Sequence, residues 1–340
     1  MGSEMRKLGL MISLLVAIGV QSCDEKQNPT NPIPIAKKVK PAFEILATPK
    51  FNADSAYAFI AKQVSFGPRV PNTEAHRKCA NWLELKLKEY GLETNVQEAQ
   101  LKAYNGQTLT TFNIMGQINP SASNRLLFCA HWDSRPYADR DSEKRSTPID
   151  GANDGASGVG VILEMARVLS VDSNLKDFGI DVVFFDAEDY GKPEGSMIGR
   201  SSDSWCLGSQ YWAANIPIPN YKPRFGILLD MVGASNAVFP KEGISMYYAP
   251  HIVNRVWKIA GAMGHDGYFK SFKGNEITDD HRYLNAIANI PTIDVIHYEM
   301  GRNDFGSFHH THKDNMDVID RTTLQVVGDV MLQVVYQEAK

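Results

Sequence analysis

The chain has 340 residues, of which 43% are apolar and 22% are charged, and its formal net charge is -4. This length and apolar content are sufficient for a large globular domain with a buried core. The small net negative charge argues against nucleic acid as a partner, because binding to phosphates requires concentrated lysine and arginine.

The first 22 residues have the pattern of a bacterial lipoprotein signal peptide. Arg6 and Lys7 precede an apolar run over residues 8–20, which is too short to span a bilayer comfortably. The run ends in Val-Gln-Ser-Cys, which resembles a lipobox, so we expect cleavage before Cys23 and lipidation of that residue. An ordinary secretory signal followed by a coincidental cysteine is the alternative.

A polar, proline-rich segment over residues 24–42 follows and is typical of a flexible tether. Together with Cys23 it would connect a lipid anchor to a single domain over residues 43–340. We therefore expect a monomer in the bacterial cell envelope, periplasmic or associated with the outer membrane, and held there by its lipid.

Regular elements are predicted in alternation along residues 43–340. Ala80, Leu83 and Leu87 recur on one helical face, and Gly91 follows them. Short apolar runs such as RLLFCA and DVVFF indicate buried strands. In chain order we predict helices over residues 53–65 and 73–90, strands over 111–118 and 125–130, a helix over 158–168, strands over 181–185, 225–229 and 293–296, and a helix over 322–337.

This alternation predicts an α/β fold with an open, twisted, mostly parallel sheet and helices on both faces, that is, a three-layer sandwich. Ligands of such folds bind beyond the carboxyl ends of the strands. Most clusters of acidic and histidine residues in this chain follow a predicted strand.

Three cysteines, Cys79, Cys129 and Cys206, remain after the anchor residue, and an odd number leaves at least one thiol free. We favour buried free thiols, with one disulfide as the alternative.

Five polar clusters carry the chemistry, and their residue types favour a zinc site. Zinc binds histidine nitrogens and carboxylate oxygens, and a catalytic site keeps one coordination position open. A carboxylate next to a ligand can then act as general base. Each cluster alone has another interpretation, such as a helix cap at Asp154 or a surface histidine tract at residues 309–312. The clusters are His131-Trp132-Asp133, residues 151–155 (GANDG), residues 186–189 (DAED), Asp230, and residues 309–312 (HHTH).

The order of these motifs resembles the glutaminyl cyclases, which share the fold of the M28 zinc aminopeptidases. The resemblance covers about residues 55–338. Its motifs are residues 67–71 (GPRVP), 130–134 (AHWDS), 151–154 (GAND), 184–189 (FFDAED), 228–233 (LLDMVG) and 279–281 (DDH), and His310-Thr311 followed by Asp314.

The resemblance implies one catalytic zinc per chain, bound by Asp154, Asp189 and His310, with Glu188 as the general acid and base. The implied reaction is cyclisation of an N-terminal glutamine to pyroglutamate with release of ammonia. The implied partners are peptides or proteins that begin with glutamine.

Two further carboxylates have implied roles. Asp230 matches the carboxylate that positions the reacting amide, and Asp279 matches one in the same hydrogen-bond network. An apolar pocket must select the bent glutamine, and the candidate lining residues are Trp132, Trp205, Phe308 and His309.

The chain departs from the animal cyclases in three ways. They carry glutamate where this chain has Asp189, tryptophan where it has His309, and a disulfide beside the first histidine motif. These departures are typical of bacterial relatives.

A two-zinc aminopeptidase is the first alternative, because His131 and Asp230 match the positions that bind a second metal in such enzymes. A lipoprotein that binds ligands without catalysis is the second alternative. The intact Glu188 and ligand set argue against it.

Replacing the anchor residue should release the protein from the membrane. We expect Cys23→Ser to move the protein into the soluble fraction, because the acyl chains that hold it can no longer be attached. Fractionation of cells that produce the two forms measures this, and continued membrane association of the variant would refute the lipobox interpretation.

Overall fold

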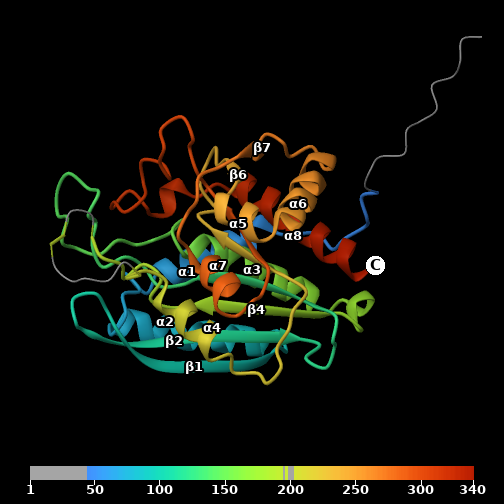
Figure 1. Ribbon diagram of the computed structural model, residues 1–340, viewed down its shortest axis with the longest axis horizontal. Coiled ribbons are helices and arrows are strands. Elements are labelled where there is room, and N and C mark those ends of the chain that lie inside the picture. The colour runs from blue at the N-terminus through green and yellow to red at the C-terminus, as the bar shows by residue number, and fades with distance from the viewer. Residues whose placement is uncertain (1–43, 194–195, 198–202) are drawn as a thin grey trace, which may run out of the picture. The chain divides into compact units, whose positions relative to one another are not determined.

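A six-stranded sheet lies at the centre of the computed structural model, which describes residues 44–193, 196–197 and 203–340 (Figure 1). The predicted signal peptide, Cys23 and tether lie outside the described residues. The strands are β1 (Glu93–Lys102), β2 (Thr108–Ile118), β3 (Arg125–His131), β4 (Gly179–Phe185), β5 (Gly226–Asp230) and β8 (Thr292–Ile296), with a separate pair of β6 (Phe239–Lys241) and β7 (Phe269–Lys273).

The sheet has the strand order β1-β2-β4-β3-β5-β8. The pairs β4–β3, β3–β5 and β5–β8 are parallel, whereas β1–β2 and β2–β4 are antiparallel. The predicted open, mostly parallel sheet is therefore confirmed, with an antiparallel hairpin added at one edge. The sequence did not predict β1, because its run ETNVQEAQLK is polar and it pairs only at that edge.

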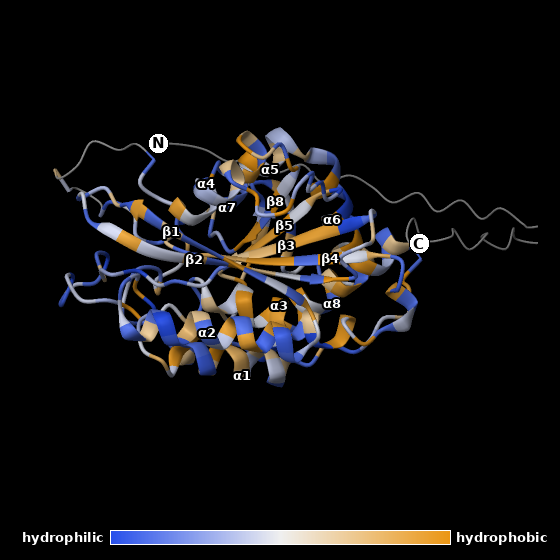
Figure 2. Cartoon of the chain, turned by 90° about the horizontal axis from the view of Figure 1, so that it is seen from below, coloured by the Kyte–Doolittle hydropathy of each residue, from blue (hydrophilic) through white to orange (hydrophobic). Residues whose placement is uncertain are grey.

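Helices cover both faces of the sheet, as predicted (Figure 2). One face carries α1, α2, α3 and α8, and the other carries α4 and α7. The helices are α1 (Ala53–Val64), α2 (Glu74–Glu89), α3 (Ala156–Leu169), α4 (Leu207–Ala214), α5 (Gly243–Tyr248), α6 (Pro250–Ala262), α7 (Asp280–Ala286) and α8 (Arg321–Ala339), with two short 3-10 turns at Ser173–Leu175 and Met316–Val318.

Strand β3 shows how the core is divided between the two faces. All of its residues are buried, and successive side chains point to opposite faces of the sheet. Leu126 and Phe128 belong to the larger core beneath α1, α2 and α3. Leu127 and Cys129 belong to the smaller core, which includes Trp212 of α4. Burial on both sides fixes the register of the strand, and this fixes where its last residue lies.

The three cysteines of the domain are buried free thiols, which confirms the favoured interpretation. Among the described residues, no helix combines the length and apolar character needed to cross a bilayer.

The carboxyl ends of the central parallel strands carry polar residues. β3 ends at His131, β4 is followed directly by Asp186, and β5 ends at Asp230. Because β3 pairs in parallel with both β4 and β5, these three ends lie side by side.

The start of α3 packs so closely on the sheet that only glycine fits there. A Cβ added to Gly158 would lie 2.0 Å from the carbonyl oxygen of Leu229 in β5. We expect Gly158→Ala to lower the free energy of unfolding by roughly 1–3 kcal/mol, because the helix must shift away from the sheet. Urea unfolding measures this.

Gly267→Ala is the matched control, since nothing lies within 4 Å of an added Cβ at Gly267. Its free energy of unfolding should stay within about 0.5 kcal/mol of the parent. Equal losses in the two variants would contradict this account of the α3 contact.

Candidate metal centre and active site

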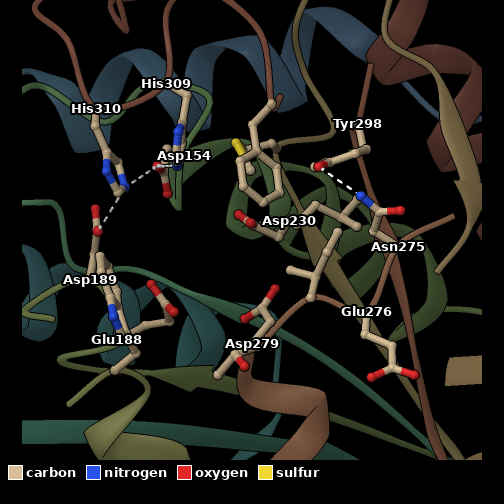
Figure 3. Close-up of a pocket in the computed structure, with 16 residues that line it drawn as sticks. Asp154, Glu188, Asp189, Asp230, Asn275, Glu276, Asp279, Tyr298, His309 and His310 are labelled. Atoms are coloured by element: carbon tan, nitrogen blue, oxygen red, sulfur yellow. Dashed lines mark hydrogen bonds and ion pairs between the residues drawn. The ribbon is translucent and has the colours of Figure 1, made fainter. Parts of the chain in front are cut away.

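A cavity of about 370 Å³ opens beyond the carboxyl ends of the strands (Figure 3). Carboxylates, two histidines and several apolar side chains form its walls. The lining residues are Asp154, Glu188, Asp189, Trp205, Asp230, Met231, Asn275, Glu276, Ile277, Thr278, Asp279, Ile296, Tyr298, Phe305, His309 and His310.

The turn after β4 presents Glu188 and Asp189 to the cavity. Ala187 adopts a left-handed backbone conformation with φ 51°, which turns the chain sharply at the end of the strand. The carboxylate of Asp133 accepts hydrogen bonds from the backbone amides of Glu188 at 3.1 Å and Asp189 at 3.2 Å. Asp133, from the first histidine motif, therefore fixes the backbone that carries these two side chains.

Asp154 is held in a similar way by a carboxylate from a distant part of the chain. The two carboxylate oxygens of Asp314 accept from the amides of Asn153 at 2.7 Å and Asp154 at 3.0 Å. Helix α3 begins after Gly155, and within the described residues no side-chain hydrogen bond caps it. The interpretation of Asp154 as a helix cap is therefore wrong, and its carboxylate is available to the cavity.

A buried arginine joins the loops on either side of this segment. The Arg69 side chain donates to the carbonyl oxygens of Trp132 at 2.9 Å and Gly151 at 2.8 Å. The GPRVP motif at residues 67–71 thus has a structural explanation, since Arg69 fastens the His131 loop to the Asp154 loop.

Three of the predicted residues, Asp154, Asp189 and His310, lie close together (Figure 3). The Nε2 atom of His310 lies 3.3 Å from Asp189 Oδ1 and 3.7 Å from Asp154 Oδ2. Ligand atoms of a tetrahedral zinc with bonds of about 2.0–2.1 Å lie about 3.3–3.4 Å apart. His309 is close as well, with its Nε2 atom 3.8 Å from Asp154 Oδ2.

His131 and Asp230 form a second group on the other side of Asp154. His131 Nε2 lies 3.1 Å from Asp154 Oδ1 and 3.2 Å from Asp230 Oδ1. Asp154 therefore directs one carboxylate oxygen toward His131 and the other toward His310. This is the arrangement that a carboxylate shared by two metal ions would have.

Glu188 lies beside the ligand group, in contact with a thiol and other acids. Its Oε1 atom accepts from Cys206 Sγ at 3.1 Å. Burial raises the pKa of Glu188 well above its usual range, and the charges of Asp279 and Asp189 raise it further. A carboxyl group with a raised pKa accepts a proton more readily than an ordinary glutamate does.

Burial also shifts the pKa of other groups in the cavity. It lowers the pKa of His310 to about 3, with help from the positive charge of Arg135, so the imidazole is neutral and can bind a metal. Burial raises the pKa of Asp230 to about 7, although His131 opposes the shift. Asp279, which caps α7 by accepting from the amide of Asp280, also has a raised pKa because it is buried.

The apolar walls differ in part from the sequence prediction. Trp205 and His309 line the cavity. Trp132 does not, because its side chain is fully buried in the larger core and its ring stacks on His76 at 4.6 Å. Phe308 packs instead against His297, with ring centroids 6.0 Å apart. Phe305, three residues earlier in the same loop, lines the cavity.

Sequence reasoning missed Arg135, Asp139 and Cys206. Arg135 and Asp139 lie four residues apart directly after the first histidine motif, and this spacing was the signal available. Cys206 offered no signal, because its contact with Glu188 depends on the fold. His312 lies apart from the cavity and is exposed, with its Nδ1 atom 2.6 Å from Asp141 Oδ2.

Comparison with known families adds to this geometry. Residues 113–335 match the model of peptidase family M28. The chain belongs to this family.

Several solved structures resemble the chain over most of its length. It is 51% identical to a glutaminyl cyclase from Tannerella forsythia, with a TM-score of 0.82, and the match covers 85% of this chain and 99% of that one. It is also 51% identical to a Zn-dependent exopeptidase from Parabacteroides distasonis, with a TM-score of 0.83 and the same coverage.

A curated relative is more distant. The chain is 27% identical over 288 residues to aminopeptidase YwaD of Bacillus subtilis, and the match covers 81% of this chain. It spans only 55% of the length of that aminopeptidase.

Membership of family M28 and the zinc-dependent neighbour imply zinc. The side chains of this M28 chain fit such an ion. Their donors are carboxylate oxygens and imidazole nitrogens, which zinc prefers. Among the described residues, the buried Oδ2 atom of Asp189 has no hydrogen-bond partner. A buried carboxylate oxygen without a partner is costly, and an ion would remove that cost.

Proposed function

We propose that the chain is a glutaminyl cyclase, which converts the N-terminal glutamine of peptides or proteins to pyroglutamate and releases ammonia. The observation that carries the proposal is its 51% identity to a solved bacterial glutaminyl cyclase over 99% of that chain. The position of Glu188 supports it, because its carboxylate lines the cavity beside the group of Asp154, Asp189 and His310.

The reaction needs a proton shuttle but no water. The α-amine nitrogen of the substrate forms a bond to its own γ-carbonyl carbon, and the bond from that carbon to the amide nitrogen breaks. Glu188 takes a proton from the attacking amine and returns one to the leaving nitrogen, which departs as ammonia. Proton transfer by a positioned side chain contributes about 10²- to 10⁴-fold to the rate.

Asp154, Asp189 and His310 would hold one zinc ion. When bound there, zinc polarises the γ-carbonyl and stabilises the negative charge that develops on its oxygen. Asp230 and Asp279 line the same cavity as Glu188. Their carboxylates can hold the substrate's amine, which fixes its direction of attack.

The cavity walls favour the bent form of the glutamine side chain. Trp205, Ile296 and Phe305 contribute apolar surface to the cavity. Such a wall binds the methylene groups of the side chain and excludes water, so the amine is held near the carbonyl carbon. An intramolecular attack in a fixed geometry gains rate from proximity alone.

A two-zinc aminopeptidase is the second candidate function. The observation in its favour is the contact of His131 with both Asp154 and Asp230 at 3.1 and 3.2 Å, which would suit a second ion. In that enzyme Glu188 would activate water, and the peptide bond after the first residue would break.

The product formed from a glutaminyl dipeptide amide distinguishes the two functions. We expect the purified domain over residues 43–340 to release one ammonia per substrate and to leave the peptide bond intact. Mass spectrometry of the product, with an ammonia assay, measures this. Free glutamine and a shortened product would replace the proposal with the aminopeptidase, and zinc analysis should then give two ions per chain.

Two substitutions separate acid–base catalysis from metal binding. Glu188→Gln keeps the shape of the side chain but cannot exchange the proton, so kcat should fall by about 10² or more while zinc remains bound. His310→Ala should lose the zinc itself. Atomic absorption and steady-state kinetics measure both effects. A Glu188→Gln variant with nearly full activity would exclude Glu188 as the proton shuttle.

A further inference from the structure

A buried arginine lies beside two of the predicted metal ligands. Arg135 follows β3 and is 0% exposed. Its Nη1 atom donates to the main-chain oxygen of Asp189 at 3.0 Å and to Asp189 Oδ1 at 3.4 Å. The other edge of its guanidinium binds Asp139 through two hydrogen bonds of 2.7 and 2.6 Å. One rigid group therefore connects Asp189 to Asp139.

Asp139 extends this connection to His310. Its Oδ1 atom lies 3.5 Å from His310 Nδ1, the ring nitrogen opposite the one that faces Asp154 and Asp189. A carboxylate at the second nitrogen fixes the tautomer and the direction of a metal-binding imidazole.

Trp205 completes the enclosure of the His310 ring. The indole and the imidazole are nearly parallel, at 9°, with centroids 5.8 Å apart. The Arg135 guanidinium lies 4.5 Å from the indole centroid, a distance at which the cation and the ring attract each other. Gly191 lies against the indole, since an added Cβ would come within 2.0 Å of it.

We propose that Arg135 is a positioning residue that sets the spacing and orientation of Asp189 and His310 as metal ligands. Its planar guanidinium can bind Asp139 at one edge and Asp189 at the other in a fixed geometry. A lysine ammonium is a single point charge and cannot hold two carboxylates in this way. The proposal rests on the ligand set of the proposed function and holds for a cyclase or a peptidase.

The chain contains a matched control for a role that is merely structural. Arg125 lies at the opposite end of β3 and is also buried. It binds Asp181 through two hydrogen bonds of 2.6 and 2.8 Å, which resemble those between Arg135 and Asp139. Loss of either arginine should therefore cost stability, but only Arg135 should affect the metal.

The test compares zinc affinity in Arg135→Lys and Arg125→Lys, measured by competition with a chromophoric chelator. We expect Arg135→Lys to weaken zinc binding by about 10- to 100-fold, as loss of a group that orients a ligand typically does. The affinity of Arg125→Lys should stay within about twofold of the parent. Visible absorption of the cobalt-substituted proteins should change for Arg135→Lys alone, because it reports ligand geometry.

Parent-like zinc affinity and cobalt absorption in Arg135→Lys would overturn the proposal, as would equal weakening in Arg125→Lys. If Arg135→Lys does not fold, Asp139→Asn takes its place, because asparagine keeps the size of the side chain but removes the carboxylate from His310. Unchanged zinc affinity in Asp139→Asn would then refute the proposal. A parent protein without zinc affinity would overturn the ligand set itself and the proposal with it, whatever reaction the protein catalyses.

Discussion

The repulsion among buried carboxylates at the carboxyl ends of the strands is the constraint on which the rest of the site depends. Five buried carboxylates line one cavity, namely Asp154, Glu188, Asp189, Asp230 and Asp279. Burial is the main cause of the raised pKa of Glu188, and the like charges of Asp279 and Asp189 raise it further. Favourable interactions elsewhere in the fold offset the free-energy cost of holding these charges together. A bound cation would reduce that cost.

Two other carboxylates bind backbone amides and so hold the loops of the site in place. Asp133 accepts from two successive amides of the turn after β4, and Asp314 does the same for the segment before α3. Hydrogen bonds from backbone amides stabilise a charged carboxylate and also fix the loop that donates them. The carboxylates that line the cavity are therefore carried by loops that are fastened at their backbones, on strands whose register is set by burial on both faces.

The sequence predicted the parts of this structure that depend on local pattern. Apolar runs such as RLLFCA predicted the buried strands. The polar residues after them predicted the cavity at the carboxyl ends of these strands. The polar edge strand β1 was missed, since half-exposed strands carry little apolar signal. Trp132 was predicted to line the cavity, but its side chain packs in the larger core with Phe128 and Ala130. The contact of Cys206 with Glu188 depends on how two loops pack, which no local pattern encodes.

The predicted metal ligands suit either hydrolysis or cyclisation. We therefore expect the cavity walls to decide between the two reactions. Asp154 directs one oxygen toward His310 and the other toward His131, so the same carboxylate could hold one ion or bridge two. Hydrolysis needs a water molecule beside Glu188, whereas cyclisation needs that space filled by the substrate's own amine. In the proposed cyclase, apolar side chains such as Trp205 and Phe305 would disfavour the water and favour the folded glutamine. We therefore expect the reaction specificity of this chain to depend more on these walls than on the predicted metal ligands.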